Sequence, residues 1–152
     1  MRVPILALSL AFAGPVLAGP LPDGGVTLQE VASALRASSL PVEVNKDANG
    51  DPMIDSSFKG TKFGVYFYDC KKQTRCGSIQ FAAGYSGAAA TPARIADWNR
   101  GKRFGRAYLD GGSAWVEMDA DMERGATTEA LANNLERWLE VMPQFATHIG
   151  AR

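Results

Sequence analysis

Three segments of the chain carry apolar residues at helical spacing, and residues that start or stop helices bound each of them. The first segment has a capping box of Thr27 and Glu30 and ends before Pro41. The second begins at Thr91-Pro92 and runs to about residue 99, and the third is capped by Thr127 or Thr128. Pro143 lies inside the third helix and is expected to kink it or to split off its last turn.

Between these helices apolar and polar residues alternate, as they do in half-buried strands. The clearest case is KFGVYFYDCKKQTRCGSIQFAAGY, residues 62–85, which predicts two strands around a five-residue loop. Antiparallel pairing of Cys70 with Cys76 sets Phe67 against Ile79, Val65 against Phe81, and Phe63 against Ala83, all on one face. The other face is expected to hold Tyr66, Tyr68, Ser78, Gln80 and both cysteines.

Further alternation predicts short strands at residues 41–44 and 52–55, and a second pair at residues 103–110 and 113–121. The order is therefore α-β-β-β-β-α-β-β-α. It predicts an α+β fold, in which an antiparallel sheet is flanked by helices and covered mainly on one face. Trp115 faces outward like Tyr66 and Tyr68, so the second face is either an exposed apolar strip, for a peptide or a homodimer partner, or is covered by the N-terminal helix.

The first eighteen residues contain one basic residue, Arg2, followed by a continuous uncharged run. That run is shorter than the ~20 residues that span a bilayer, which favours a secretory signal peptide over a membrane anchor. We expect cleavage after Ala18 and export to the periplasm. A flexible leader over residues 19–26 and a single domain over residues 27–150 should then remain, with no attachment to the membrane.

Cys70 and Cys76 predict a structural disulfide, because an exported protein meets an oxidising compartment. Redox use and metal binding are the alternatives. However, the spacing is not Cys-x-x-Cys, and no second pair or nearby histidine completes a zinc set. The segment DANGD, residues 47–51, resembles the start of a calcium-binding loop, but Pro52 stands where glycine is required, so a tight turn is expected. No cofactor and no metal is predicted.

The chain has sixteen basic and sixteen acidic residues, so any electrostatic function depends on local clustering and nucleic acid is a poor ligand. The second helix is expected to run back toward the hairpin loop and so to bring seven basic residues to one end. Solvated charges that offset the helix dipole are one interpretation, and a surface for an anionic protein, peptide or glycan is the other. These residues are Lys71, Lys72, Arg75, Arg100, Lys102, Arg103 and Arg106.

Enzyme motifs are weak in this sequence. GYSGA, residues 84–88, resembles a nucleophile elbow only loosely, and the one histidine, His148, lies near the end of the chain. Glu117, Asp119 and Asp121 alternate on one strand face and are expected to be solvated. A non-enzymatic binding protein without catalytic residues is therefore predicted, with an envelope hydrolase or hydrolase inhibitor acting through the basic end as the alternative.

Three stretches resemble the YbjN family of bacterial sensory transduction regulators. They are FGVYFYDC with CGSIQFAAGY, then IADWNRGKRFGRAYLD, and the final amphipathic helix around Trp138. The resemblance covers residues 27–149, and its most specific part contains Trp98, Asn99, Arg103 and Phe104. It implies the small α+β fold of type III secretion chaperones and a sensory or chaperone-like role, and it implies no reaction. Trp98 and Asn99 are expected to anchor the second helix to the sheet.

Overall fold

The computed structural model describes residues 19–22, 24–71, 74–87 and 89–151, so the predicted signal peptide at residues 1–18 lies outside the described residues. The order of elements is α-β-β-β-β-α-β-β-α and the fold is α+β, as predicted. The elements are α1 (Leu28–Ala37), β1 (Glu43–Lys46), β2 (Pro52–Phe58), β3 (Thr61–Lys71), β4 (Arg75–Ser86), α2 (Pro92–Gly101), β5 (Arg106–Asp110), β6 (Ser113–Asp121) and α3 (Thr128–Ile149).

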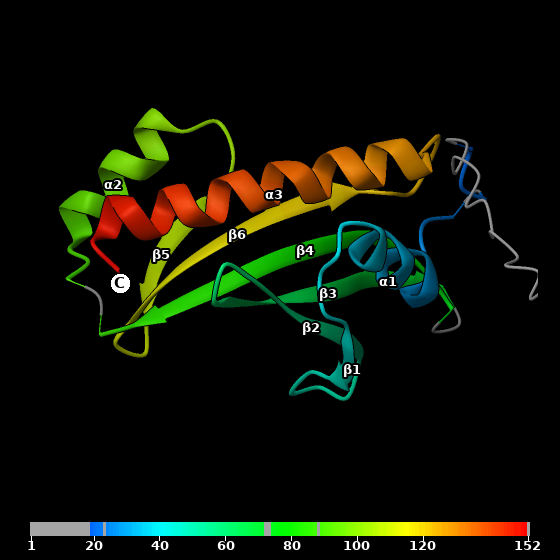
Figure 1. Cartoon of the computed structure of the whole chain (residues 1–152), viewed down its shortest axis with the longest axis horizontal. Coiled ribbons are helices and arrows are strands. Elements are labelled where there is room, and N and C mark those ends of the chain that lie inside the picture. Colours follow the sequence, from blue (N-terminus) through cyan, green and yellow to red (C-terminus); the bar gives the residue numbers. More distant parts are fainter. Residues whose placement is uncertain (1–18, 23, 72–73, 88, 152) are drawn as a thin grey trace, which may run out of the picture.

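The strands form one antiparallel sheet in the order β1-β2-β3-β4-β6-β5. The helices lie on one face of it, with α3 along its length, α1 beside α3 at one end and α2 at the other end (Figure 1). Because α1 packs on α3 and β2, it does not cover the face that carries Tyr66. Within the described part of the chain that second face has no helix on it, and we call it the open face.

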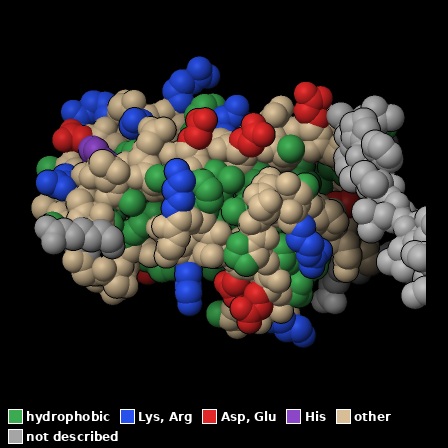
Figure 2. Space-filling view, viewed as in Figure 1, with side chains coloured by type: hydrophobic (Ala, Val, Ile, Leu, Met, Phe, Trp, Pro, Cys, Tyr) green, Lys and Arg blue, Asp and Glu red, His purple; other side chains and the backbone are tan. Residues whose placement is uncertain are grey.

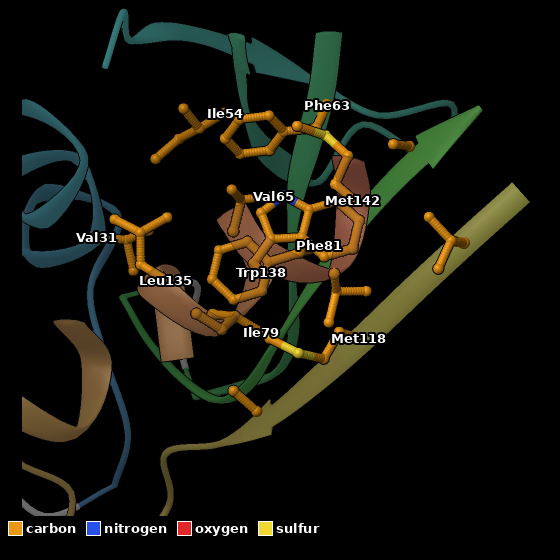
Figure 3. Close-up of a cluster of buried hydrophobic side chains, with 14 of the residues drawn as sticks. Val31, Ile54, Phe63, Val65, Ile79, Phe81, Met118, Leu135, Trp138 and Met142 are labelled. Atoms are coloured by element: carbon orange, nitrogen blue, oxygen red, sulfur yellow. The ribbon is translucent and has the colours of Figure 1, made fainter. Parts of the chain in front are cut away.

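The core lies between the sheet and the helices and is built around Trp138 of α3 (Figure 3). The indole is fully buried and stacks on Phe81 with 5.7 Å between ring centroids, while Phe63 meets it edge-on at 6.0 Å. Its Nε1–H has no hydrogen-bond partner among the described residues. The side chain therefore stabilises the fold through packing alone, and its buried donor opposes part of that gain.

The hairpin of β3 and β4 has the predicted register. Phe67 pairs with Ile79, Val65 with Phe81 and Cys70 with Cys76. Phe63 and Ala83 are buried on the same side. The apolar alternation of the two strands was therefore sufficient to fix their register, because a slip by one residue would turn the aromatic side chains out of the core.

The predicted position of the cysteines on the tyrosine face is wrong. Cys76 is 3% exposed within the core, and Cys70 packs against the same cluster. The alternation ends at Asp69, whose φ of 54° is left-handed, and Asp69 and Gly77 are missing from the paired register. The end of the ribbon consequently directs the disulfide toward the core side of the sheet.

Reducing the Cys70–Cys76 disulfide should lower the free energy of unfolding by about 2 kcal/mol, because the bond closes a short loop in the unfolded chain. Urea unfolding of the mature chain with and without a reductant measures this difference. The variant Cys70→Ala/Cys76→Ala is the control and should not respond to the reductant. An unchanged midpoint for the reduced wild-type protein would contradict the expectation.

Residues 19–22 and 24–26, which belong to the predicted flexible leader, make defined contacts, and we call them the N-terminal strap. The amide of Leu21 donates to the Ala126 carbonyl at 2.9 Å, and Val26 exchanges two backbone hydrogen bonds with Cys76. The side chains of Leu21 and Val26 are buried. The strap thus covers the core beside the hairpin end, while its mobility in solution stays a prediction.

The helix starts are those the sequence indicates. Thr27 and Glu30 form the capping box of α1, Thr91 caps α2, and Thr127 rather than Thr128 caps α3. Each cap satisfies an amide that has no partner within the helix.

The α3 helix is not split at Pro143 and continues to Ile149. Met142 and Phe145, on either side of the proline, are completely buried. The free energy gained by burying these two side chains is comparable to the roughly 3 kcal/mol that a proline inside a helix costs. This explains why the last turn stays attached.

Candidate functional site

Side chains on the open face form rows that cross the sheet from strand to strand. One row contains Met53, Tyr66, Gln80 and Asp119. The next contains Asp55, Gly64, Ala82, Glu117 and Arg106. By alternation, Tyr68, Tyr108 and Trp115 share this face, as predicted for Tyr68 and Trp115.

Two aromatic rings and a floor of small residues form a shallow groove of about 240 Å³ on the open face. The Tyr66 ring lies over Gly64, where a Cβ atom would come within 2.8 Å of it. The Trp115 ring lies over Gly84 in the same way, at 2.9 Å. The glycines let both rings lie against the backbone, and Ala82 also lines the groove. Because ligand pockets usually measure about 300–1,000 Å³, this groove suits one side chain of a partner rather than a small molecule.

Glu117 is not the solvated carboxylate that the sequence predicts. It is 9% exposed and accepts hydrogen bonds from the Tyr108 hydroxyl at 2.6 Å and from the Arg106 guanidinium at 2.5 Å. Both donors come from β5, the neighbouring strand. Charge-assisted bonds of this kind fix all three side chains in one arrangement. Asp119 and Asp121 are exposed, as predicted.

The paired rows of the open face carry more acidic than basic side chains. The acidic residues are Glu43, Asp55, Asp110, Glu117, Asp119 and Asp121. The basic residues are Lys62 and Arg106, and Lys71 lies near Asp121 at the hairpin end of the face. Since the whole chain has equal numbers of acidic and basic residues, the excess of negative charge here is matched by positive charge elsewhere on the molecule.

All four tyrosines have a raised pKa, Tyr85 in the core and the other three on the open face. Burial raises the pKa of Tyr85 from 10.0 to about 12, and burial together with the hydrogen bond to Glu117 raises the pKa of Tyr108 to about 12. Burial first, and then nearby carboxylates, also raise the pKa of Tyr66 and Tyr68. Glu117 contributes to the raised pKa of all three tyrosines on the open face, which is consistent with a negative potential there.

Alkaline titration should destabilise the protein through Tyr85 and Tyr108. Their folded-state pKa exceeds the unfolded value, so the unfolded chain loses these protons first as pH rises. Their contribution to stability is complete below pH 10.0 and is lost as pH rises toward about 12. Phenolate absorbance measured against pH, in the wild type and in Tyr108→Phe, should show one late-titrating group fewer in the variant. Titration of all four tyrosines near the usual pKa of 10.0 in the folded protein would contradict this.

The structure does not bring together the six described residues of the predicted basic cluster. The α2 helix has ten residues and is about 15 Å long, whereas β4 has twelve residues and is about 40 Å long. The helix therefore returns along less than half of the strand and does not reach the hairpin end (Figure 1). On the face shown in Figure 2, several basic side chains gather around α2, with acidic side chains among them.

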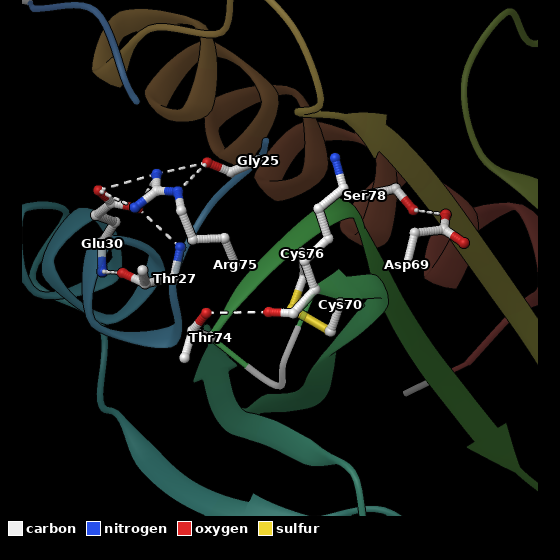
Figure 4. The surroundings of a disulfide bond; sticks show 10 residues. Gly25, Thr27, Glu30, Asp69, Cys70, Thr74, Arg75, Cys76 and Ser78 are labelled. Atoms are coloured by element: carbon white, nitrogen blue, oxygen red, sulfur yellow. Dashed lines mark hydrogen bonds and ion pairs between the residues drawn. A yellow bond between two sulfur atoms is a disulfide. The ribbon is translucent and has the colours of Figure 1, made fainter. Parts of the chain in front are cut away.

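At the hairpin end, Arg75 makes contacts within the protein and is not a free surface charge (Figure 4). Its guanidinium forms an ion pair with Glu30 at 3.0 Å and donates to the Gly25 carbonyl. It thereby joins β4 to the strap and to the capping box of α1. Lys71 lies 3.8 Å from Glu123 in an exposed pair, and Lys72 lies outside the described residues.

The second group of basic residues surrounds Phe104, whose side chain is 42% exposed. Arg103 and Arg137 lie over its ring, at 5.7 and 4.3 Å from the centroid. We call Arg100, Lys102, Arg103, Phe104 and Arg137 the α2 corner. The sequence did not indicate Arg137, because it comes from α3 and meets Phe104 only in the folded chain.

Trp98 and Asn99 anchor α2 to the sheet as predicted. The Trp98 Nε1–H donates to the Gly105 carbonyl at 2.7 Å. The Asn99 side-chain amide forms two hydrogen bonds of 2.9 Å with the backbone of Ala107. Ala107 lies on β5, an edge strand, so Asn99 takes the place of a neighbouring strand at that point.

The contacts of Ser86 and His148 do not support a Ser–His site. The Ser86 hydroxyl lies 3.1 Å from that of Ser113, and His148 Nε2 lies 2.7 Å from the Arg94 carbonyl oxygen. In the part of the chain that the structure describes, no group of three or more His, Cys, Asp or Glu residues could hold a metal ion.

The sequence profile of the YbjN family matches residues 27–151, which include every helix and strand of the structure. The chain belongs to the YbjN family. The family is described as a "putative bacterial sensory transduction regulator", which supports a regulatory or accessory role and names no reaction. No curated protein gives a significant match to this YbjN chain. None of its described helices is long and apolar enough to cross a membrane.

Proposed function

We propose that this YbjN protein is an exported, non-enzymatic accessory protein that binds a partner protein or peptide through the open face of its sheet. Its sensory or chaperone-like role would then consist of this binding. Export is supported by the charge-free apolar run near the N-terminus and by the disulfide, a bond that persists in oxidising compartments such as the periplasm.

One observation carries the proposal: an uncovered sheet face that presents aromatic side chains in fixed positions. Tyrosine, tryptophan and arginine are the residue types enriched at the energetic centres of protein interfaces. Here Tyr66 and Trp115 lie against glycines, and Glu117 fixes Tyr108 and Arg106. Side chains that are ordered before binding lose less conformational entropy when a partner arrives.

The test is site-specific photo-crosslinking in the native bacterium. A photoreactive residue at Tyr68, which is 45% exposed, should capture one reproducible partner that mass spectrometry identifies. The same probe at Glu136, which is exposed on α3, is the control and should not capture it. Trp115→Ser should abolish the Tyr68 product. Capture from Glu136 alone, or no product from Tyr68, would contradict binding through the open face.

The α2 corner is a second candidate surface, for an anionic group on a partner or an envelope glycan. It is favoured by the exposed Phe104 and the two guanidinium groups near its ring, which offer planar, bidentate contacts to carboxylates. A hydrolase inhibitor would use this corner in the same way. Arg103→Glu should then remove partners that survive Trp115→Ser, and an unchanged set of partners would argue against the corner.

A further inference from the structure

We infer that the partner of the open face presents a basic segment, one of whose Lys or Arg side chains enters the groove between Tyr66 and Trp115. This inference rests on the proposed function and adds the chemistry of the partner. It differs from the anionic partner that the sequence indicated for Arg106, because Arg106 lies among carboxylates on the open face and is bonded to one of them.

The first support is charge that the fold does not neutralise. Glu117 is paired with Arg106, but Asp55 accepts its hydrogen bond from the neutral amide of Asn45, and Asp119 accepts one from the neutral amide of Gln80. Neither carboxylate has an ion-pair partner among the described side chains. Asp55 lines the groove, and Asp119 stands on β6 in the row that also contains Tyr66.

The second support is the shape of the groove. The rings of Tyr66 and Trp115 lie against Gly64 and Gly84 and both line the groove, so they can offer aromatic surface to a ligand that enters it. A cation over an aromatic face is attracted by the ring quadrupole, and tryptophan and tyrosine bind cations well. A groove of about 240 Å³ next to a carboxylate therefore suits a single ammonium or guanidinium group with its alkyl stem.

Among the described residues, Lys62 is the one basic side chain that lines the groove, so it repels an entering cation. Its neutralisation should therefore strengthen binding, whereas loss of a side chain that merely supports the fold would leave binding unchanged or weaken it. A second copy of this chain is a poor occupant of the open face, because pairing two such faces would oppose two sets of carboxylates.

The test uses the mature chain with an oligo-arginine peptide and an oligo-glutamate peptide of equal length as probes. Trp115 fluorescence reports binding, because Trp98 and Trp138 are 1% and 0% exposed. Oligo-arginine should give a saturable change that weakens with salt, and oligo-glutamate should give none. Asp55→Asn/Asp119→Asn should raise the Kd for oligo-arginine roughly fivefold or more, and Lys62→Gln should lower it roughly two- to fivefold.

The matched control is Glu129→Gln/Glu136→Gln, which makes the same charge change on the exposed side of α3 and should leave the Kd within about twofold. Equal weakening by this control would show attraction to net charge only and would overturn the inference. So would absence of a saturable change, or equal binding of oligo-glutamate. If Tyr68 crosslinks to a non-basic segment of a partner, the inference fails and the proposed function stands. If Tyr68 captures no partner, the proposed function fails as well.

Discussion

Trp138→Ala should lower the free energy of unfolding by about 3–5 kcal/mol. The indole is completely buried and contacts Phe81 of β4 and Phe63 of β3, so its removal leaves a cavity where α3 meets the middle of the sheet. Since these neighbours belong to a rigid sheet, the cavity cannot collapse fully. Chemical denaturation followed by far-ultraviolet circular dichroism measures the loss.

Trp138→Phe is the informative control for this position. Phenylalanine keeps the stacking on Phe81 and also removes the Nε1–H that lacks a hydrogen-bond partner. We expect a loss of less than half that of the alanine variant. Equal losses for both variants would show that the indole contributes something other than packing.

Gly105→Ala should cost about 2–4 kcal/mol, because it combines backbone strain with overpacking. Gly105 has a φ of 81°, and a Cβ atom there would come within 2.6 Å of Val141 Cγ1 and 3.1 Å of Val116 Cγ2. Both valines are buried, so neither can move away cheaply. The substitution would also disturb the carbonyl that accepts the Trp98 hydrogen bond and so loosen α2.

Gly101→Ala is the matched control, four residues earlier in the same region. Gly101 lies in α2 without a left-handed φ, and a Cβ atom there would meet nothing within 4 Å. Alanine should therefore leave stability unchanged or raise it by roughly 0.5–1 kcal/mol, as expected in an exposed helix. Thermal unfolding of the two variants side by side checks both values. Similar losses for both would contradict the assigned role of Gly105.

Features set by neighbouring residues could be predicted from the sequence. The capping box of Thr27 and Glu30 involves positions three residues apart, and the register of Phe67 with Ile79 follows from alternation across one short hairpin. The anchoring of α2 by Asn99 was also predictable, because its partner Ala107 follows soon after it in the chain.

Features that depend on distant segments were missed. The left-handed backbone of Asp69 turns the cysteines to the opposite face from the one predicted. The strap pairs through Val26 with Cys76, which lies about fifty residues away in the chain. In the sequence, Glu117 looks like one of three carboxylates that face solvent. Only the pairing of β5 with β6 in the structure shows that Arg106 and Tyr108 form hydrogen bonds with it. The prediction that α2 brings its basic residues to the hairpin end was wrong, because the sequence indicates the direction of α2 but not how far it extends along β4.

The groove illustrates why the open face could be located but not described from sequence. Alternation placed Tyr66 and Trp115 on it correctly. In the sequence, Gly64 and Gly84 only interrupt the strand pattern. The structure shows that an aromatic ring lies over each of them. The charge of the face likewise emerges only when acidic residues from β1, β2, β5 and β6 are brought together.

Collisional quenching of Trp115 fluorescence by caesium and iodide ions tests most directly whether the open face is uncovered and negatively charged. Trp98 and Trp138 are buried, so these ions reach Trp115 selectively, and Trp115→Phe should remove the quenching. At low ionic strength, and relative to free N-acetyltryptophanamide, we predict stronger quenching by caesium than by iodide, with a smaller difference in Asp55→Asn/Asp119→Asn. Equal or stronger quenching by iodide, or protection of Trp115 from both ions, would contradict an uncovered, negatively charged open face.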